Sequence, residues 1–287
     1  CNSATLTPHP SSDDLSSFYP PIYCFAPDQG KAGFLKRLRQ KLEFNLFFLP
    51  QYRDQVKRVL RGTNWNGEKD RRLLDIGCGQ GFRLQPFQER GFKVEGMDFQ
   101  PESVDYVRNH LGIDAACCDI EGLTTHFDSD FYDVITAFYV VEHVPSVVDF
   151  FTQCFTLLKP GGWVAASVPL VDSIQCRLLA SRWASVTEAP RHLSIPTQDG
   201  LRAVCNEMGF THVNIVPDSL SVCSAQIGMS LFPGGLNTHT HGSRSLSATF
   251  ARSLGAVTTI LSIPMIAIEN YILGRPGLGI VFAQKPY

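Results

Sequence analysis

A run of alternating glycines between two apolar stretches could bind a nucleotide. In the segment RRLLDIGCGQGFRLQPFQERGFKVEGMD (71–98), a short apolar run breaks at Gly77, Gly79 and Gly81, and a second apolar run follows after a helix-length interval. Glycine lets the backbone approach a ligand closely. The helix that follows would present its unpaired amides and its positive end to that ligand. The order strand, glycine turn, helix, strand therefore predicts a nucleotide-binding half of an α/β fold.

The spacing of these glycines distinguishes two kinds of nucleotide site. The run is Gly-x-Gly-x-Gly, whereas the dinucleotide fingerprint is Gly-x-Gly-x-x-Gly, and Phe82 occupies its last position. Asp75, two residues before the first glycine, would repel a pyrophosphate but would suit a cationic amino-acid ligand. A nicotinamide-dependent oxidoreductase is thus an alternative that the spacing disfavours.

The segment DIGCGQG (75–81) resembles the first motif of the class I S-adenosylmethionine-dependent methyltransferases, acidic-x-Gly-x-Gly-x-Gly. Two later segments, FYVVEHV (138–144) and LLKPGGWVAASVP (157–169), are similar to later motifs of this family, the first most closely to the ubiquinone-biosynthesis O-methyltransferases and their bacterial relatives. The resemblance covers 71–216 and the last strand. It implies S-adenosylmethionine as cofactor and methyl transfer to a small molecule, at a hydroxyl oxygen in preference to nitrogen or carbon.

The resemblance assigns the cofactor contacts to the ends of the first strands. Asp98 would accept hydrogen bonds from both ribose hydroxyls, Asp119 would accept one from the adenine amino group, and Ile120 would cover the ring. Each acid also has an ordinary interpretation, as a helix N-cap or turn residue for Asp98 and as a turn cap for Asp119. The expected cofactor-binding residues are Asp75, Gly77, Cys78, Gly79, Gly81, Asp98, Phe99, Asp119, Ile120 and Phe138.

A hydroxyl acceptor must lose its proton, and a neutral histidine suits that step. The candidate catalytic residues are His143 in VVEHVP, its neighbour Glu142, and His192 in PRHLSIPT. Alternatively, Glu142 and His143 form a hydrogen-bonded pair that fixes the next helix, and His192 is a loop residue bonded to backbone. In the resembled group a Glu-x-x-Glu-His cluster can hold a divalent cation. Because Tyr139 replaces its first carboxylate here, we expect no metal.

Apolar runs predict seven strands, at 73–76, 94–98, 113–118, 132–139, 163–168, 212–216 and 279–284. The resemblance implies an α/β, Rossmann-like methyltransferase sheet with strand order 3-2-1-4-5-7-6 and an antiparallel strand 7. The helix after the glycine loop contains Pro86 and should be short or bent.

The segments outside the core would choose the acceptor. We expect a disordered arm (1–22), a helical N-terminal cap (23–70) with a basic amphipathic stretch at 31–49, the core (71–219), an apolar helical insertion (220–274) and the last core strand (275–287).

Within the insertion, Ser253 to Ile268 is uncharged and interrupted by Pro264, and it is shorter than the roughly 20 residues that span a bilayer. It could cover the active site, join two subunits or rest on a membrane, in that order of preference. His239 and His241 have a weak metal-like spacing, but a solvated loop is the better interpretation.

Composition narrows the class of protein. The chain has 287 residues, a formal net charge of −2 and a sequence pI near 6.5, which argues against a nucleic-acid partner. Nine cysteines without a Cys-x-x-Cys pair suggest reduced thiols and a cytoplasmic location, and the start at Cys1 leaves upstream processing open. A non-catalytic S-adenosylmethionine-binding relative and a membrane-associated binding module are the other functions we consider.

Overall fold

A seven-stranded sheet forms the centre of the protein. The computed structural model describes residues 1–10, 12–19, 38, 42, 44–232 and 246–287, so most of the basic stretch at 31–49 and both His239 and His241 lie outside the described residues. The sheet consists of β2 (Arg72–Ile76), β3 (Lys93–Asp98), β4 (Ala115–Cys117), β5 (Tyr132–Phe138), β6 (Leu158–Pro169), β8 (Thr211–Pro217) and β9 (Leu278–Gln284).

The strand order is β4-β3-β2-β5-β6-β9-β8, and β9 is antiparallel to both of its neighbours. This confirms the expected order 3-2-1-4-5-7-6. Because the first five of these strands are parallel, their carboxyl ends meet at one edge of the sheet. We call it the carboxyl edge, and ligands of open α/β sheets bind along such an edge.

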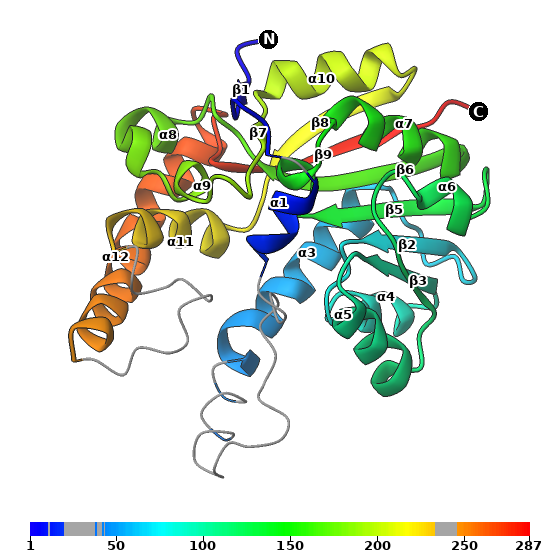
Figure 1. The fold of residues 1–287 in the computed structure, drawn as a ribbon, viewed down its shortest axis with the longest axis horizontal. Coiled ribbons are helices and arrows are strands. Elements are labelled where there is room, and N and C mark those ends of the chain that lie inside the picture. The colour runs from blue at the N-terminus through cyan, green and yellow to red at the C-terminus, as the bar shows by residue number, and fades with distance from the viewer. Residues whose placement is uncertain (11, 20–37, 39–41, 43, 233–245) are drawn as a thin grey trace.

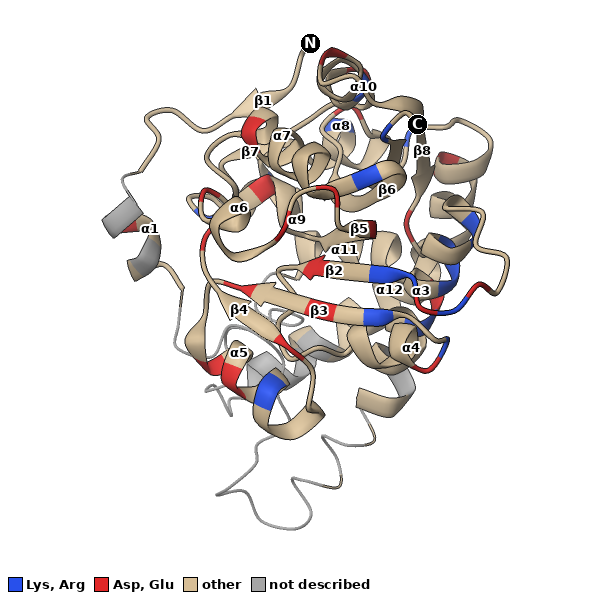
Figure 2. Ribbon diagram, turned by 90° about the vertical axis from the view of Figure 1, so that its right-hand side faces the viewer, with Lys and Arg blue, Asp and Glu red and all other residues tan. Residues whose placement is uncertain are grey.

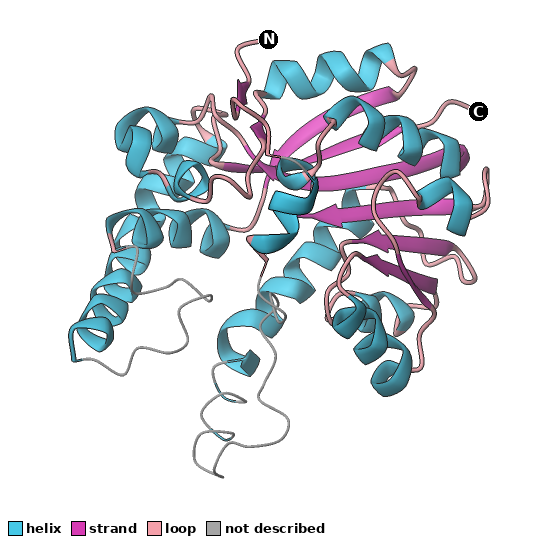
Figure 3. Ribbon diagram, viewed as in Figure 1, coloured by secondary structure: helices cyan, strands magenta, loops and turns pink. Residues whose placement is uncertain are grey.

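Helices cover both faces of the sheet (Figure 1; Figure 3). One core cluster joins the sheet to α3 (Leu49–Gly62), α4 (Leu84–Gln88) and α5 (Pro101–Tyr106), which runs on into the π-helical turn η2 (Val107–Leu111). The second joins it to α6 (Leu123–His126), α7 (Val147–Leu157) and α10 (Gln198–Glu207). A fully buried leucine or phenylalanine contributes about 1.5–3 kcal/mol, so both layers stabilise the sheet.

The expected short helix after the glycine loop is α4, and Pro86 is its third residue. A proline in the first turn costs little because the amide it lacks would have no partner there. The helix α7 ends at Leu157, and Pro160 and Gly161 lie inside β6, which follows it directly. An irregular register between β5 and β6 at this end accommodates them.

The N-terminal segment is not the disordered arm that we expected, at least in its described part. Strand β1 (Ala4–Thr5) pairs antiparallel with β7 (Ser194–Ile195), and the Thr197 hydroxyl donates to the Cys1 carbonyl at 2.7 Å. These hydrogen bonds give partners to backbone groups of the segment, although its polar composition had predicted no regular structure. The short helix α1 (Ser12–Ser17) then lies in front of the carboxyl edge (Figure 1).

The apolar insertion forms two helices that pack on each other, α11 (Leu220–Leu231) and α12 (Leu246–Tyr271). They lie at one side of the sheet beside α8 (Ile174–Leu179), the 3-10 turn η4 (Ala180–Arg182) and α9 (Ala184–Thr187) (Figure 1).

Our objection from length was wrong, because α12 continues through Pro264. Among the described residues, one segment, Ser253–Tyr271, is long and apolar enough to cross a membrane by length and composition. A core helix of a soluble protein would pass the same test.

The last turn of α3 packs directly on the sheet at Gly62. A Cβ at this position would overlap the ring of Phe282, which is buried in β9 and cannot move aside. We expect Gly62→Ala to lower the free energy of unfolding by about 1–3 kcal/mol, the usual cost of overpacking a core. Chemical denaturation would measure it. Arg61→Ala, on the exposed side of the same turn, is the control and should change stability by less than about 0.5 kcal/mol.

Candidate functional site

The glycine loop after β2 has the backbone that glycine alone adopts easily. The φ angles of Gly77, Gly79 and Gly81 are +69°, +53° and +73°. A Cβ would overlap Val140 at Gly77 and would lie 2.6 Å from a methyl of Leu111 at Gly81. The loop therefore needs glycine for both its conformation and its packing.

Asp75 lies buried beneath this loop and is only partly satisfied. Its Oδ1 accepts a 2.7 Å hydrogen bond from the Thr136 hydroxyl, whereas Oδ2 has no partner among the described residues. Burial raises the pKa of Asp75 to about 6, although the positive charge of Arg83 opposes the shift. In Figure 2, β2 carries acidic colour near its tip, at the carboxyl edge. An unsatisfied buried oxygen at this edge fits a cationic ligand.

Asp98 ties the end of β3 to the glycine loop. Its Oδ2 accepts from the Gly79 amide at 2.8 Å and its Oδ1 from the Gln100 amide at 2.9 Å. Burial raises the pKa of Asp98, and these backbone hydrogen bonds oppose the rise. Each carboxylate oxygen can accept a second hydrogen bond. Asp98 therefore makes the hydrogen bonds of a turn residue. Its carboxylate can still accept hydrogen bonds from the ribose hydroxyls.

The other expected cofactor residues lie along the same edge. Asp119 is exposed after β4, and its Oδ1 accepts from the Gly122 amide at 2.8 Å, which is the turn-capping role that we had kept as an alternative. Ile120 packs against the core, Phe99 is exposed and contacts the ring of Tyr19, and Phe138 ends β5. The carbonyl of Asp98 accepts from the Cys118 amide, so the ends of β3 and β4 are adjacent.

The three candidate catalytic residues meet at the end of β5. Glu142 and His143 lie in the 3-10 turn η3 (Val141–His143), and the His143 and His192 rings are 4.7 Å apart. Potential ligand atoms of the three side chains lie within 4.8 Å of one another. Our argument against a metal assumed two ligands, whereas the structure places His192 beside them as a third.

Burial shifts the pKa values of Glu142 and His192 in opposite directions. Burial raises the pKa of Glu142 to about 8, and its Oε2 has no partner in the described part of the chain. Burial, reinforced by His143, holds the pKa of His192 well below 6.5. His192 Nδ1 lies 2.6 Å from the Ser185 carbonyl, which can only accept, so Nδ1 carries the proton and Nε2 keeps its lone pair. His143 Nδ1 lies 3.0 Å from both the Arg191 carbonyl and the Tyr19 hydroxyl.

The amino-acid sequence matches the model of a known protein family. Residues 43–215, more than half of the chain, match the model of a family described as a methyltransferase domain. The chain belongs to this family. The match and the strand order confirm the resemblance to class I methyltransferases in family and fold.

Sequence relatives match a shorter stretch. A ubiquinone biosynthesis O-methyltransferase of Nitrobacter winogradskyi is 40% identical over 101 residues, which are 33% of this chain and 38% of that protein. One from Coxiella burnetii is 36% identical over 99 residues, 33% of this chain and 42% of that protein. The chain thus matches about two fifths of the length of these relatives.

Solved structures share the fold at low identity. Phosphoethanolamine N-methyltransferase 2 of Haemonchus contortus, in complex with S-adenosyl-L-methionine, has a TM-score of 0.56 and 16% identity, covering 81% of this chain and 52% of that one. A SAM-dependent methyltransferase of Archaeoglobus fulgidus has a TM-score of 0.52 and 19% identity, covering 85% and 98%. At such identities the likeness concerns the fold alone.

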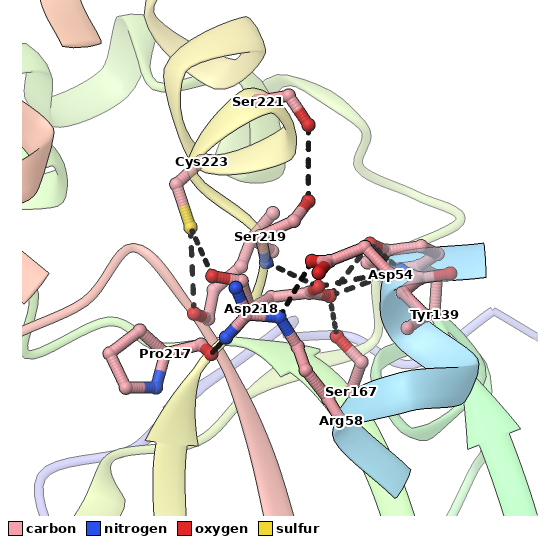
Figure 4. Close-up of polar contacts among 11 residues, drawn as sticks. Asp54, Arg58, Tyr139, Ser167, Pro217, Asp218, Ser219, Ser221 and Cys223 are labelled. Atoms are coloured by element: carbon pink, nitrogen blue, oxygen red, sulfur yellow. Dashed lines mark hydrogen bonds and ion pairs between the residues drawn. The ribbon is translucent and has the colours of Figure 1, made fainter. Parts of the chain in front are cut away.

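The sequence reasoning missed a buried polar network at the ends of β5, β6 and β8. Asp218 accepts from the hydroxyls of Ser167 at 2.6 Å and Tyr139 at 2.8 Å, and from the Ser219 amide at 2.6 Å (Figure 4). Gln55 Nε2 approaches the same carboxylate at 3.3 Å. An acid directly after a strand was the signal that singled out Asp98, and applied to β8 it would have found Asp218.

A second missed residue reaches the site from the N-terminal segment. The Tyr19 hydroxyl lies 3.0 Å from His143 Nδ1, and its ring contacts Phe99 with centroids 4.9 Å apart. Tyr19 therefore lies over the carboxyl edge between the cofactor residues and the histidines. Its position in a polar segment without apolar periodicity gave no signal in the sequence.

Asp98 and Asp119, the two acids that we expect to bind the nucleoside, differ in burial, and this predicts different effects of substitution. We expect Asp98→Asn to weaken S-adenosylmethionine binding by about ten- to a hundredfold, because an amide cannot accept from all its buried partners. Asp119→Asn should weaken binding by less than about fivefold, because its carboxylate is exposed. Titration calorimetry measures both, and similar losses for the two variants would contradict this assignment.

Proposed function

We propose that this protein is an S-adenosylmethionine-dependent methyltransferase that methylates a hydroxyl oxygen of an apolar small molecule. The observation that carries the proposal is the placement of a neutral imidazole, His192, beside a carboxyl edge whose acids and glycine loop suit an adenosyl sulfonium. The names of the relatives from Nitrobacter winogradskyi and Coxiella burnetii support an oxygen acceptor.

In the proposed reaction the bound cofactor supplies the methyl group. The carbon–sulfur bond breaks as the carbon–oxygen bond forms in line, and the hydroxyl proton passes to His192 Nε2. The Ser185 carbonyl holds the ring in the tautomer that leaves Nε2 free to accept. Glu142 and His143 orient the acceptor beside this base. Positioning and exclusion of water supply most of the rate, because the transition state loses charge rather than gaining it.

The alternative function is a non-catalytic relative that keeps the cofactor site. It would bind S-adenosylmethionine without transferring the methyl group. The unpartnered Glu142 oxygen favours the enzyme, because a buried carboxyl without a partner is costly in a merely structural role. We also propose that the acceptor is a small molecule, that no nucleic acid binds and that no metal is required. We place the reaction in the cytoplasm, where the cofactor is made.

His192→Ala tests the base. We expect kcat for labelled-methyl transfer to a long-chain alkyl phenol to fall about 10²- to 10³-fold, with S-adenosylmethionine affinity within twofold of wild type. Because the pKa of His192 is lowered, its base form persists at neutral pH, and the wild-type rate should decline only well below pH 6.5 as the ring becomes protonated.

The control for this experiment is His126→Ala, since His126 is exposed on α6. Full turnover by His192→Ala would exclude the base role. Loss of wild-type activity on dialysis against a chelator, restored by a divalent ion, would show that the three clustered side chains bind a metal instead. Cofactor binding without turnover on any phenol or alcohol would favour the non-catalytic relative.

We propose that α12 rests on an anionic membrane surface. Five apolar residues on it are exposed at helical spacing, Val257, Ile260, Leu261, Ile268 and Tyr271, and the exposed Ile272 follows directly after the helix. Only 28% of its most apolar window is buried inside the protein, so this face is available for contact. The same helix is anchored by Glu269, which accepts from the Gln175 amide at 2.9 Å, so we place it on the surface rather than across the bilayer.

The charge composition of two segments of the sequence favours the membrane over a second copy of the chain. Residues 219–268 contain two arginines and no acidic residue, and residues 29–42 contain five lysines and arginines and no acidic residue. Basic segments without acidic residues, in a chain that also has an exposed apolar helix face, suit anionic lipid headgroups. A membrane position would also give access to an apolar or lipid-linked acceptor.

Replacing Ile260 and Leu261 together by aspartate should reduce flotation with phosphatidylglycerol vesicles at least fivefold, because both side chains are exposed apolar contacts. Val148→Asp, an exposed position on α7, is the control and should float like wild type. Unchanged flotation of the double variant would reject the proposal. If light scattering instead showed a wild-type dimer that the double variant loses, the face would be a subunit contact.

A further inference from the structure

Backbone groups hold the proposed base His192 from two sides. Its Nδ1 lies 2.6 Å from the carbonyl oxygen of Ser185 in α9, and the amide of the next residue, Leu193, donates to the Glu142 carbonyl at 2.7 Å. In a neutral histidine, the hydrogen bond made by one ring nitrogen sets which of the two carries the proton. The position of the Ser185 carbonyl therefore decides whether Nε2 can accept a proton.

The helix α9 is too short to fix this carbonyl by itself. It has a single turn, Ala184–Thr187, and Pro190 follows shortly after it, which disfavours helical backbone in the residue before the proline. The Ala189 amide, which a longer helix would direct to Ser185, donates to the Val186 carbonyl at 3.3 Å instead. The Ser185 carbonyl is thereby left open to the imidazole. Since an isolated helical turn is unstable, another element must hold α9 in place.

The helix α11 lies against α9 and supplies this support through two side chains one turn apart (Figure 1). The Ser230 hydroxyl accepts from the Ala184 amide at 2.8 Å, which gives a partner to the first amide of α9. Gln226 Oε1 accepts from the Ser185 hydroxyl at 3.3 Å. Ser185 and Ser230 are 1% and 6% exposed, so water does not readily replace these partners when they are lost.

This support comes from outside the part of the chain that matches the family. The family match ends at residue 215, whereas α11 begins at Leu220. Cys223 and Ile227 of α11 pack with Ile266 of α12, so α11 is itself held by the second helix of the insertion. The carbonyl that faces the proposed base is therefore supported by the insertion, in addition to the shared sheet.

We propose that Gln226 and Ser230 are positioning residues that keep His192 in the Nδ1-protonated tautomer by way of Ser185. The inference rests on the proposed function, in which His192 is the base. Ser230 fixes the start of α9 and Gln226 fixes the side chain of Ser185, so the carbonyl keeps facing Nδ1. Without these two hydrogen bonds α9 is free to turn, and the proton exchanges between the two ring nitrogens. A ring that carries its proton on Nε2 cannot accept the hydroxyl proton of the acceptor there.

The test measures the tautomer and the rate separately. In protein with isotope-labelled histidine, the nitrogen chemical shifts distinguish a protonated from an unprotonated ring nitrogen, and the signals that are lost in His192→Ala identify this ring. We expect wild-type protein without ligand to show Nδ1 protonated and Nε2 unprotonated at neutral pH. The double variant Gln226→Met, Ser230→Ala should show a mixture of both tautomers.

The rate should follow the tautomer. We expect kcat of the double variant for labelled-methyl transfer to a long-chain alkyl phenol to fall about five- to twentyfold, because only the Nδ1-protonated fraction acts as the base. Its affinity for S-adenosylmethionine should stay within twofold of wild type. Ser221→Ala, exposed on the same helix, is the control and should change neither the tautomer nor the rate.

Each outcome decides the inference. Protonation of wild-type His192 on Nε2, or a double variant with the wild-type tautomer, would overturn it whatever the rate. If the tautomer changed as expected but the wild type methylated no phenol or alcohol, the positioning role would stand while the proposed function failed. If thermal melting showed that the double variant does not fold, Gln226→Met alone, at a half-buried position, would replace it. A mixture of tautomers would then support the inference, and an unchanged ring would overturn it.

Discussion

The hydrogen bonds from backbone amides to Asp98 hold together the part of the molecule on which the rest depends. The Gly79 amide belongs to the glycine loop after β2 and the Gln100 amide to the start of α5, so one carboxylate joins two βα connections. Parallel pairing of β2, β3 and β4 brings their ends to one edge. The three positive φ angles then let the loop backbone lie open to a ligand at that edge.

The buried acids of the site differ in how completely they are satisfied. Asp218 accepts from two hydroxyls and a backbone amide and needs no further partner. Asp75 and Glu142 each keep one oxygen without a partner among the described residues, and burial raises both pKa values. Unsatisfied buried groups destabilise a fold unless a ligand completes them. Asp75 lies at the expected cofactor loop and Glu142 at the expected acceptor end, so the two incomplete acids lie at the two ends of the proposed site.

The segments outside the sheet have separate tasks. Through Tyr19 the N-terminal segment lies over the carboxyl edge, and β1 holds that segment against β7. The helices α11 and α12 form their own small cluster around Cys223, Ile227 and Ile266. The outward face of α12 is apolar, although its side chains are exposed and do not pack in the core. The sheet shared with the family forms the carboxyl edge, whereas we expect these additions to choose the acceptor.

The sequence by itself determined the sheet and the local motifs. Apolar periodicity located the seven main strands, the glycine spacing disfavoured a pyrophosphate site, and Pro86 predicted a short α4, because each of these depends on neighbours within a few residues. Only the tertiary structure decided that His192 joins Glu142 and His143, and that Gln55 reaches an acid 163 residues away. Such contacts arise from the packing of α3 and of the loop after β6 against the carboxyl edge, and no local pattern encodes a distance between side chains that far apart in the chain.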